Sequence, residues 1–262
     1  MTVRQVRPRL LLMQIRQTQQ TRDEEWRSFA RFCGLAVSQI GILNLFDTPE
    51  FGPDVLAGYD GLLVGGSSEA SVLEPENYPF IEPAMVLLRH CIEVRLPVFC
   101  SCFGHQLAVR ALGGRVIRDQ VDFEMGTPAI RLTEAAAQDP LYHDMPDGFA
   151  AVSVHRERAT EVPDGCTLLA YTQPCIHAFK VDGAPFWTTQ FHPEVDKPVL
   201  VERLTQFAHH YTDGDEHLQQ VLCAAQETPL SNDLLRRFVE RVVLAPANGP
   251  EDTIQGTAGA MR

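Results

Sequence analysis

Residues 97–108 read Pro97-Val98-Phe99-Cys100-Ser101-Cys102-Phe103-Gly104-His105-Gln106-Leu107-Ala108. An apolar run of β-prone residues ends at Cys102, a glycine follows two residues later, and apolar residues at helical spacing begin at Leu107. This order predicts a strand, a sharp turn and a helix, with Cys102 on the turn. The backbone N–H groups at the start of such a helix favour a thiolate, so Cys102 is a candidate nucleophile. The alternative is a small apolar core residue, as most free cysteines are.

A second stretch supplies a candidate base for this thiol. Residues 185–191 predict a strand, and His192-Pro193-Glu194 follow it directly. The strand would deliver the His192 imidazole to its end, and the Glu194 carboxylate is close enough in sequence to orient the ring and to stabilise the imidazolium. Cys102, His192 and Glu194 are therefore a candidate catalytic triad.

These two stretches resemble the class I (triad-type) glutamine amidotransferase family. The nucleophile motif of the family, G-x-C-x-G-x-Q, is matched from Cys102 to Gln106, and its late H-P-E motif is matched by His192-Pro193-Glu194. The resemblance covers residues 9–211. It implies that Cys102 attacks the side-chain amide of glutamine, forms a γ-glutamyl thioester and releases ammonia without a cofactor. No phosphate-binding G-x-x-x-x-G-K or dinucleotide-binding G-x-G-x-x-G motif occurs in the sequence, which also indicates no nucleotide cofactor.

A glycine-rich turn, Gly65-Gly66-Ser67, follows a predicted strand at residues 59–64. In open α/β sheets, ligands bind at the carboxyl ends of the strands. The resemblance implies that the N–H groups of Gly66 and Phe103 hold a developing oxyanion, and that Gly65 and Gln106 contact the substrate. The alternative is an ordinary turn without a ligand.

His155 is a competing candidate base. Within residues 149–162 the pattern predicts a strand that ends in His155-Arg156-Glu157, so this histidine also stands at a strand end with a carboxylate two residues later. The resemblance places the segment beside the glutamine pocket, which gives His155 a role in the pocket wall. A position on a surface loop is the alternative.

The match departs from the family pattern at three points. Cys100 stands where the family usually has glycine, Ser67 stands where many members have proline, and no synthetase or ATP-binding domain accompanies the motifs. The expected function is hydrolysis of glutamine, with the ammonia passed to an acceptor on a separate synthetase protein.

Two other functions stay open. Residues 102–108 and 110–114 also resemble the plant-type γ-glutamyl peptidases of this superfamily, so the substrate is either glutamine or another γ-glutamyl compound. In the second alternative the chain is a binding or regulatory module without activity.

The architecture expected is α/β, with a flavodoxin-like, open and mostly parallel sheet covered by helices on both faces. Apolar strand-like runs at 9–15, 40–46 and 59–64 alternate with helical patterns at 21–33 and 79–94, as in such a sheet. We expect the family domain at residues 1–212, a helical extension at 213–244 and a disordered tail at 245–262. The extension holds helical patterns at 216–227 and 231–244, with Ser231 as the expected cap of the second. It would pack on the domain, form a homo-oligomer or bind a partner.

Composition excludes several classes of partner. The net charge is −12 and the chain has only two lysines, so we expect no nucleic acid and no membrane surface as partner. The seven cysteines are an odd number scattered through apolar segments, which favours a reduced, cytoplasmic setting. No signal peptide or membrane span is expected from the N-terminal residues. Cys100 and Cys102 have no second nearby Cys/His pair, so no metal site is expected.

Overall fold

The computed structural model describes residues 7–119, 123–206 and 215–245. Its centre is a nine-stranded sheet with the order β2-β1-β3-β4-β13-β12-β11-β7-β8. The bounds of its strands in chain order are β1 Leu10–Gln14, β2 Ile40–Asn44, β3 Gly61–Val64, β4 Val98–Ser101, β7 Ala129–Leu132, β8 Phe149–Ala150, β11 Cys166–Tyr171, β12 Ile176–Val181 and β13 Phe186–Thr189. The strands from β2 to β13 in this order pair in parallel, and the remaining pairs are antiparallel. The predicted mostly parallel sheet is confirmed.

Two pairs of short strands lie outside this sheet. They are β5 (Val116–Arg118) with β10 (Glu157–Ala159), and β6 (Glu124–Gly126) with β9 (Ser153–His155). The helices are α1 (Gln19–Cys33), α2 (Ile81–Glu93), α3 (Phe103–Ala111), α4 (Lys197–Gln206), α6 (Asp215–Ala224) and α7 (Pro229–Phe238). Short helical turns are η1 (Val37–Gln39), η2 (Pro53–Leu56), η3 (Glu134–Gln138) and the π-helical η4 (Val239–Val243), which continues α7.

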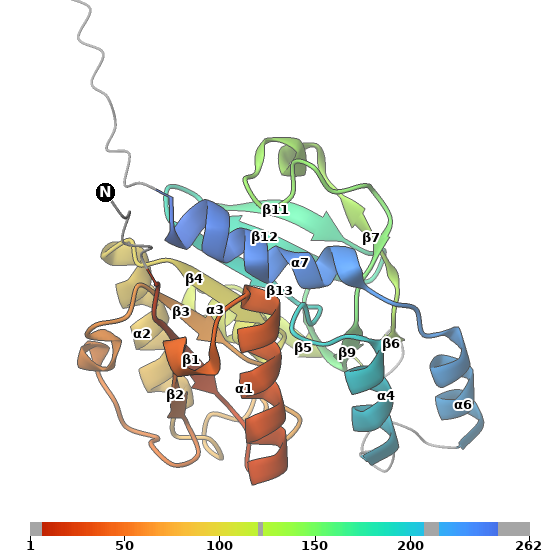
Figure 1. Ribbon diagram of the computed structural model, residues 1–262, viewed down its shortest axis with the longest axis horizontal. Helices are drawn as coiled ribbons and strands as arrows, with labels where there is room; N and C mark the ends of the chain where they lie inside the picture. Colours follow the sequence, from red (N-terminus) through yellow and green to blue (C-terminus); the bar gives the residue numbers. More distant parts are fainter. Residues whose placement is uncertain (1–6, 120–122, 207–214, 246–262) are drawn as a thin grey trace, which may run out of the picture.

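Helices cover both faces of the sheet, because the central strands are apolar on both sides. Leu11 and Met13 of β1 pack into one apolar cluster with α2 and α3, whereas Leu10 and Leu12 pack into the opposite cluster with α1 and α7. Alternate residues of a strand point to opposite faces, so a continuous apolar run serves both layers. Figure 1 shows α1 and α7 lying together over one face of the sheet.

The C-terminal helix α7 is part of this core rather than an appendage to it. Phe238 is fully buried and makes edge-to-face contacts with Phe99 of β4 and Trp187 of β13, at ring-centroid distances of 5.5 and 6.4 Å. The expected cap, Ser231, was wrong: α7 begins at Pro229, which suits a first helical position, and the Ser231 hydroxyl donates to the Thr228 carbonyl. The expected domain boundary at 212/213 and most of the expected tail lie outside the described residues.

Phe238→Ala is expected to lower the free energy of unfolding by about 3–5 kcal/mol, because it leaves a cavity between α7 and the sheet. Urea denaturation followed by circular dichroism measures the change. Leu230→Ala, on the exposed side of the same helix, is the matched control and should change the free energy little. Equal effects of the two substitutions would show that α7 does not stabilise the domain.

The single strand expected within residues 149–162 does not form. The segment forms three separate short strands, β8, β9 and β10, each paired in a different sheet. The break has a physical cause: the Val152 carbonyl accepts a hydrogen bond from the His192 backbone N–H at 2.8 Å, and the Ala151 N–H donates to Pro128. The Ala151–Pro128 bond is in register with the β7–β8 pairs, but Pro128 has no N–H to donate in return, so that ladder ends there. The Val152–His192 bond then anchors the segment beside His192.

Candidate active site

Three parallel strands deliver the candidate residues to one edge of the sheet. Cys102 follows β4, Gly65 and Gly66 follow β3, and His192 lies three residues after β13. Because β4 pairs with both β3 and β13, the carboxyl ends of these strands lie next to one another. This edge is where open α/β sheets bind their ligands.

Cys102 stands on a strained turn. Its φ is +49° and its ψ is −100°, a conformation that L-residues rarely adopt, and α3 begins at the next residue. The Cys102 N–H donates to the Thr189 carbonyl of β13 at 2.8 Å. On the other side Gly104 packs so tightly on β3 that a Cβ there would lie 2.8 Å from Val64 Cγ1. The turn is therefore fixed from both neighbouring strands.

The structure brings Cys102, His192 and Glu194 together. His192 Nδ1 lies 2.7 Å from Glu194 Oε1, and the other carboxylate oxygen accepts a hydrogen bond of 2.7 Å from the Ser101 hydroxyl. Glu194 and Ser101 are fully buried. The Ser101 bond holds the carboxylate in the orientation that the imidazole requires, and its role was not foreseen from the sequence.

Charge stabilises the protonated form of His192. Burial alone lowers its pKa, but the charges of Cys102 and Glu194 and its hydrogen bonds to them raise the pKa to about 10. Burial would raise the pKa of Glu194, whereas the imidazolium and the hydrogen bonds from His192 and Ser101 lower it to about 2. The arrangement favours the imidazolium form of His192 beside the Glu194 carboxylate.

We expect His192 to remain protonated well above pH 6.5, the usual range of histidine. The proton held in the folded state stabilises the fold below about pH 6.5, and this contribution is lost as the pH rises toward 10. NMR titration of the ring measures the pKa. Cys102→Ser and Glu194→Gln should each lower it, because each removes a partner that raises the His192 pKa, whereas Cys166→Ser should leave it unchanged. A His192 pKa that is the same in all four proteins would contradict the charge arrangement.

Two backbone N–H groups lie beside the thiol. Within the described residues the N–H groups of Gly66 and Phe103 have no hydrogen-bond partner. A Cβ at Gly66 would lie 2.9 Å from His192 Cε1 and 3.5 Å from Cys102 Cβ, so the Gly66 backbone directly adjoins both side chains. Behind it, Arg16 and Glu25 form a buried ion pair with Nη2 and Oε1 3.0 Å apart.

Of the two residues expected to contact the substrate beside the oxyanion donors, Gln106 lines the cavity and Gly65 does not. The Gly65 N–H donates to Met13 and its carbonyl accepts from Gly104, and Gly65 is not among the residues that line the cavity. Gln106 lines the cavity and donates to the Glu157 carbonyl at 2.7 Å and to Gln190 Oε1 at 3.3 Å. Gln190, which the sequence did not single out, has its amide nitrogen 3.7 Å from Cys102 Sγ.

A cavity of about 500 Å³ opens at Cys102. His155 is buried in its wall and lies 3.0 Å from Glu124, so it faces a carboxylate other than that of the triad. The charged and polar side chains in the lining of the cavity include Glu69, Tyr78, Arg118, Arg156 and Glu157. Such a cavity suits a zwitterionic ligand with a reacting carbonyl at Cys102.

The family model of the class I glutamine amidotransferases matches residues 46–206. The chain belongs to this family. The match contains Cys102, His192 and Glu194, and it confirms the family and the fold that the two motifs predicted. At the level of the family, the chain is a member of a group of cysteine-dependent amidotransferases and γ-glutamyl hydrolases.

Two curated relatives and one solved structure illustrate the similarity. A γ-glutamyl-L-1-hydroxyisopropylamide hydrolase of Pseudomonas sp. is 33% identical over 147 residues, which are 53% of this chain and 48% of the relative. A glutamine-hydrolysing GMP synthase subunit of Methanocaldococcus jannaschii is 31% identical over 118 residues, 45% of this chain and 61% of the relative. A glutamine amidotransferase of Thermotoga maritima superposes with a TM-score of 0.73 at 19% identity, covering 92% of this chain and 100% of that chain.

The matched region therefore spans about half of the first curated relative. The similarity to the Thermotoga maritima structure, at 19% identity, is one of fold alone. Among the described residues, no helix combines the length and the apolar character needed to cross a membrane.

Proposed function

We propose that this amidotransferase-family chain hydrolyses the γ-amide of glutamine through Cys102. The observation that carries the proposal is the strained Cys102 turn, which faces a buried His192–Glu194 pair and two backbone N–H groups that lack partners within the described residues. A thiolate, an imidazolium and oxyanion donors around one point are the groups that acyl transfer to sulfur requires.

The reaction proceeds in two halves. The Cys102 thiolate attacks the γ-carbonyl carbon, and the N–H groups of Gly66 and Phe103 hold the developing oxyanion. The C–N bond breaks as His192 donates its proton to the departing nitrogen, which leaves ammonia and a γ-glutamyl thioester. His192 then takes a proton from water, the hydroxide attacks the thioester carbon, and glutamate leaves as the C–S bond breaks and the Cys102 thiolate forms again beside the protonated His192.

Glu194 and Ser101 act as positioning residues for His192 in this proposal. The cavity side chains of both charge signs hold the α-carboxylate and α-ammonium groups of the substrate, and Gln106 contributes to the wall. Because the Methanocaldococcus jannaschii relative is named as one subunit of GMP synthase, we further propose that the ammonia passes to a separate acceptor protein.

One observation favours a second function, the hydrolysis of γ-glutamyl amines or peptides. The cavity volume of about 500 Å³ falls in the range of about 300–1,000 Å³ that is typical of sites for drug-sized ligands. It therefore leaves room for a leaving group larger than ammonia. The name of the Pseudomonas relative refers to hydrolysis of such a γ-glutamyl amide.

The release of glutamate from glutamine and from a panel of γ-glutamyl alkylamides and dipeptides distinguishes the two functions. Mass spectrometry quantifies the products, and Cys102→Ser is the control. If the wild type, but not Cys102→Ser, hydrolyses only glutamine, the first function is supported. If it hydrolyses only the larger amides, the second is supported. If the wild type consumes no member of the panel faster than Cys102→Ser, the proposal is wrong.

A further inference from the structure

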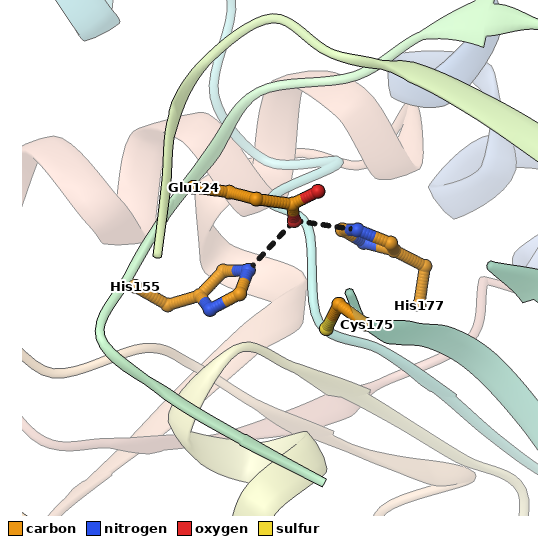
Figure 2. A group of neighbouring side chains, drawn as sticks. All are labelled: Glu124, His155, Cys175 and His177. Carbon is orange, nitrogen blue, oxygen red and sulfur yellow. Dashed lines mark hydrogen bonds and ion pairs between the residues drawn. The ribbon is translucent and has the colours of Figure 1, made fainter. Parts of the chain in front are cut away.

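A second group of reactive side chains lies next to the cavity, apart from the triad, and two of its members, Glu124 and His155, line the cavity. It consists of Glu124, His155, Cys175 and His177, and we call it the Glu-His-Cys-His cluster. Glu124 comes from β6 and His155 from the paired strand β9, while Cys175 immediately precedes β12 and His177 lies on it. Figure 2 shows the Glu124 carboxylate between the rings of His155 and His177, with Cys175 beside His177.

The four ligand atoms of the cluster are close together and shielded from water. One carboxylate oxygen of Glu124 lies 3.0 Å from His155 Nε2 and 2.7 Å from His177 Nε2. All four candidate ligand atoms, including Cys175 Sγ, lie within 4.8 Å of one another. His155, Cys175 and His177 are buried, and the side chain of Glu124 is only 12% exposed.

His177 gives an independent indication that a ligand belongs here. The residue is fully buried, yet neither of its ring nitrogens has a hydrogen-bond partner among the described residues. Nε2 is 2.7 Å from Glu124 Oε2, but the contact lacks the direction of a hydrogen bond. A buried ring nitrogen without a partner costs free energy. A cation at the centre would accept the lone pair of the one ring nitrogen that faces it.

We propose that the Glu-His-Cys-His cluster binds Zn²⁺. Two imidazoles, one thiolate and one carboxylate are a tetrahedral donor set that suits this borderline-soft ion better than Mg²⁺ or Ca²⁺. Ligand distances of about 2.0–2.3 Å place tetrahedral ligand atoms roughly 3.3–3.8 Å apart. On binding, the Glu124 oxygen would move away from the two histidine nitrogens, which lie 2.7 and 3.0 Å from it, and the wider pairs within 4.8 Å would draw together. The Thr172 hydroxyl already orients the carboxylate by donating to Glu124 Oε1 at 2.7 Å, as outer-shell partners of metal ligands do.

The ion would join the short β6–β9 pair to the central sheet. Its ligands come from both, and the β6–β9 pair carries cavity residues. On β12, the His177 carbonyl accepts from the Gln190 N–H at 2.7 Å, and the Gln190 side chain contacts Cys102 Sγ. The bound ion is therefore a structural element of the cavity wall, and it does not take part in the chemistry at Cys102. From the sequence we expected no metal site, because we considered only ligands close together in the chain.

The test is metal binding by the full chain, measured without substrate. Protein purified under reducing conditions and freed of metal is titrated with Zn²⁺ by calorimetry and, in parallel, with Co²⁺ by absorption spectroscopy. We expect one ion per chain and a thiolate-to-Co²⁺ charge-transfer band. Cys175→Ser should abolish the band, His177→Ala should abolish tight binding, and Thr172→Val should weaken Zn²⁺ affinity by about 10- to 100-fold.

Matched cysteine variants locate the ion. Cys166→Ser and Cys102→Ser should both keep the stoichiometry and the Co²⁺ band, because neither residue belongs to the cluster. Loss of the band in Cys102→Ser but not in Cys175→Ser would place the ion at the triad and overturn the proposal. A wild type that binds no more Zn²⁺ than Cys175→Ser would overturn it as well. Neither outcome depends on γ-glutamyl hydrolysis, so failure here is distinct from failure of the proposed function.

Discussion

Cys102→Ser is expected to lower kcat for γ-glutamyl amide hydrolysis by about 10⁴-fold or more. The physical reason lies in the charge state of the nucleophile. A serine hydroxyl stays protonated at neutral pH and is a far weaker nucleophile than a thiolate, so it reacts only if a base removes its proton. A thiolate needs no such base. Steady-state release of glutamate measures the effect, and trapping of the γ-glutamyl-enzyme by acid quench and mass spectrometry reports the thioester directly.

Two controls make this result specific. Cys166→Ser changes a half-buried cysteine on β11, outside the residues that line the cavity, and should retain wild-type kcat. The circular dichroism spectrum of Cys102→Ser should match that of the wild type, since the size of the side chain is preserved. An active Cys102→Ser protein, or an equal loss in Cys166→Ser, would remove Cys102 from the proposed chemistry.

Gly66→Ala is expected to lower kcat by about 10²- to 10³-fold, the range found when one oxyanion-hole donor is lost. The new methyl carbon would lie 2.9 Å from His192 Cε1 and 3.3 Å from Arg16 Nη2. The first of these distances is shorter than side chains tolerate, so the loop must retreat and carry the Gly66 N–H away from the carbonyl of the substrate. KM should change less than kcat, because this N–H binds the transition state more strongly than the ground state.

Gly52→Ala is the matched control for the second prediction. It makes the same chemical change at a glycine whose φ of −122° suits alanine, and the added Cβ meets only the side-chain oxygen of Asp54, at 3.0 Å. Its kcat and KM should stay near those of the wild type. If Gly66→Ala keeps full kcat while folding normally, the Gly66 N–H is not an oxyanion donor.

The class of fold and the position of the main site were predictable from local patterns. Continuous apolar strands indicate a sheet that is buried on both faces, and Cys102, Gly66 and His192 each follow such a strand. Carboxyl ends of neighbouring parallel strands meet at one edge, so residues far apart in the chain were expected to converge there. The motifs were sufficient because each functional residue is placed by the strand that immediately precedes it.

Contacts made between distant segments were not predictable in the same way. Ser101 ends the apolar run of β4, and nothing in its surroundings in the chain shows that its hydroxyl binds Glu194. Gln190 likewise lies in an apolar strand pattern. As a polar residue directly before Phe191 it breaks that pattern, which is a signal that could have been followed, and the structure shows it to be fully buried. Both roles depend on which strand lies next to which.

By itself, the sequence determined the alternation of strands and helices, the turn at Cys102 and the family to which the chain belongs, because these depend on residues a few positions apart. Only the tertiary structure decided that residues 149–159 divide among three sheets, that α7 completes the core, and that Glu124 meets Cys175 and His177. The physical reason is that strand order and helix packing are chosen by the burial of whole faces. The spacing of apolar residues indicates that one face of a strand or helix is apolar, but it does not indicate which segment covers that face.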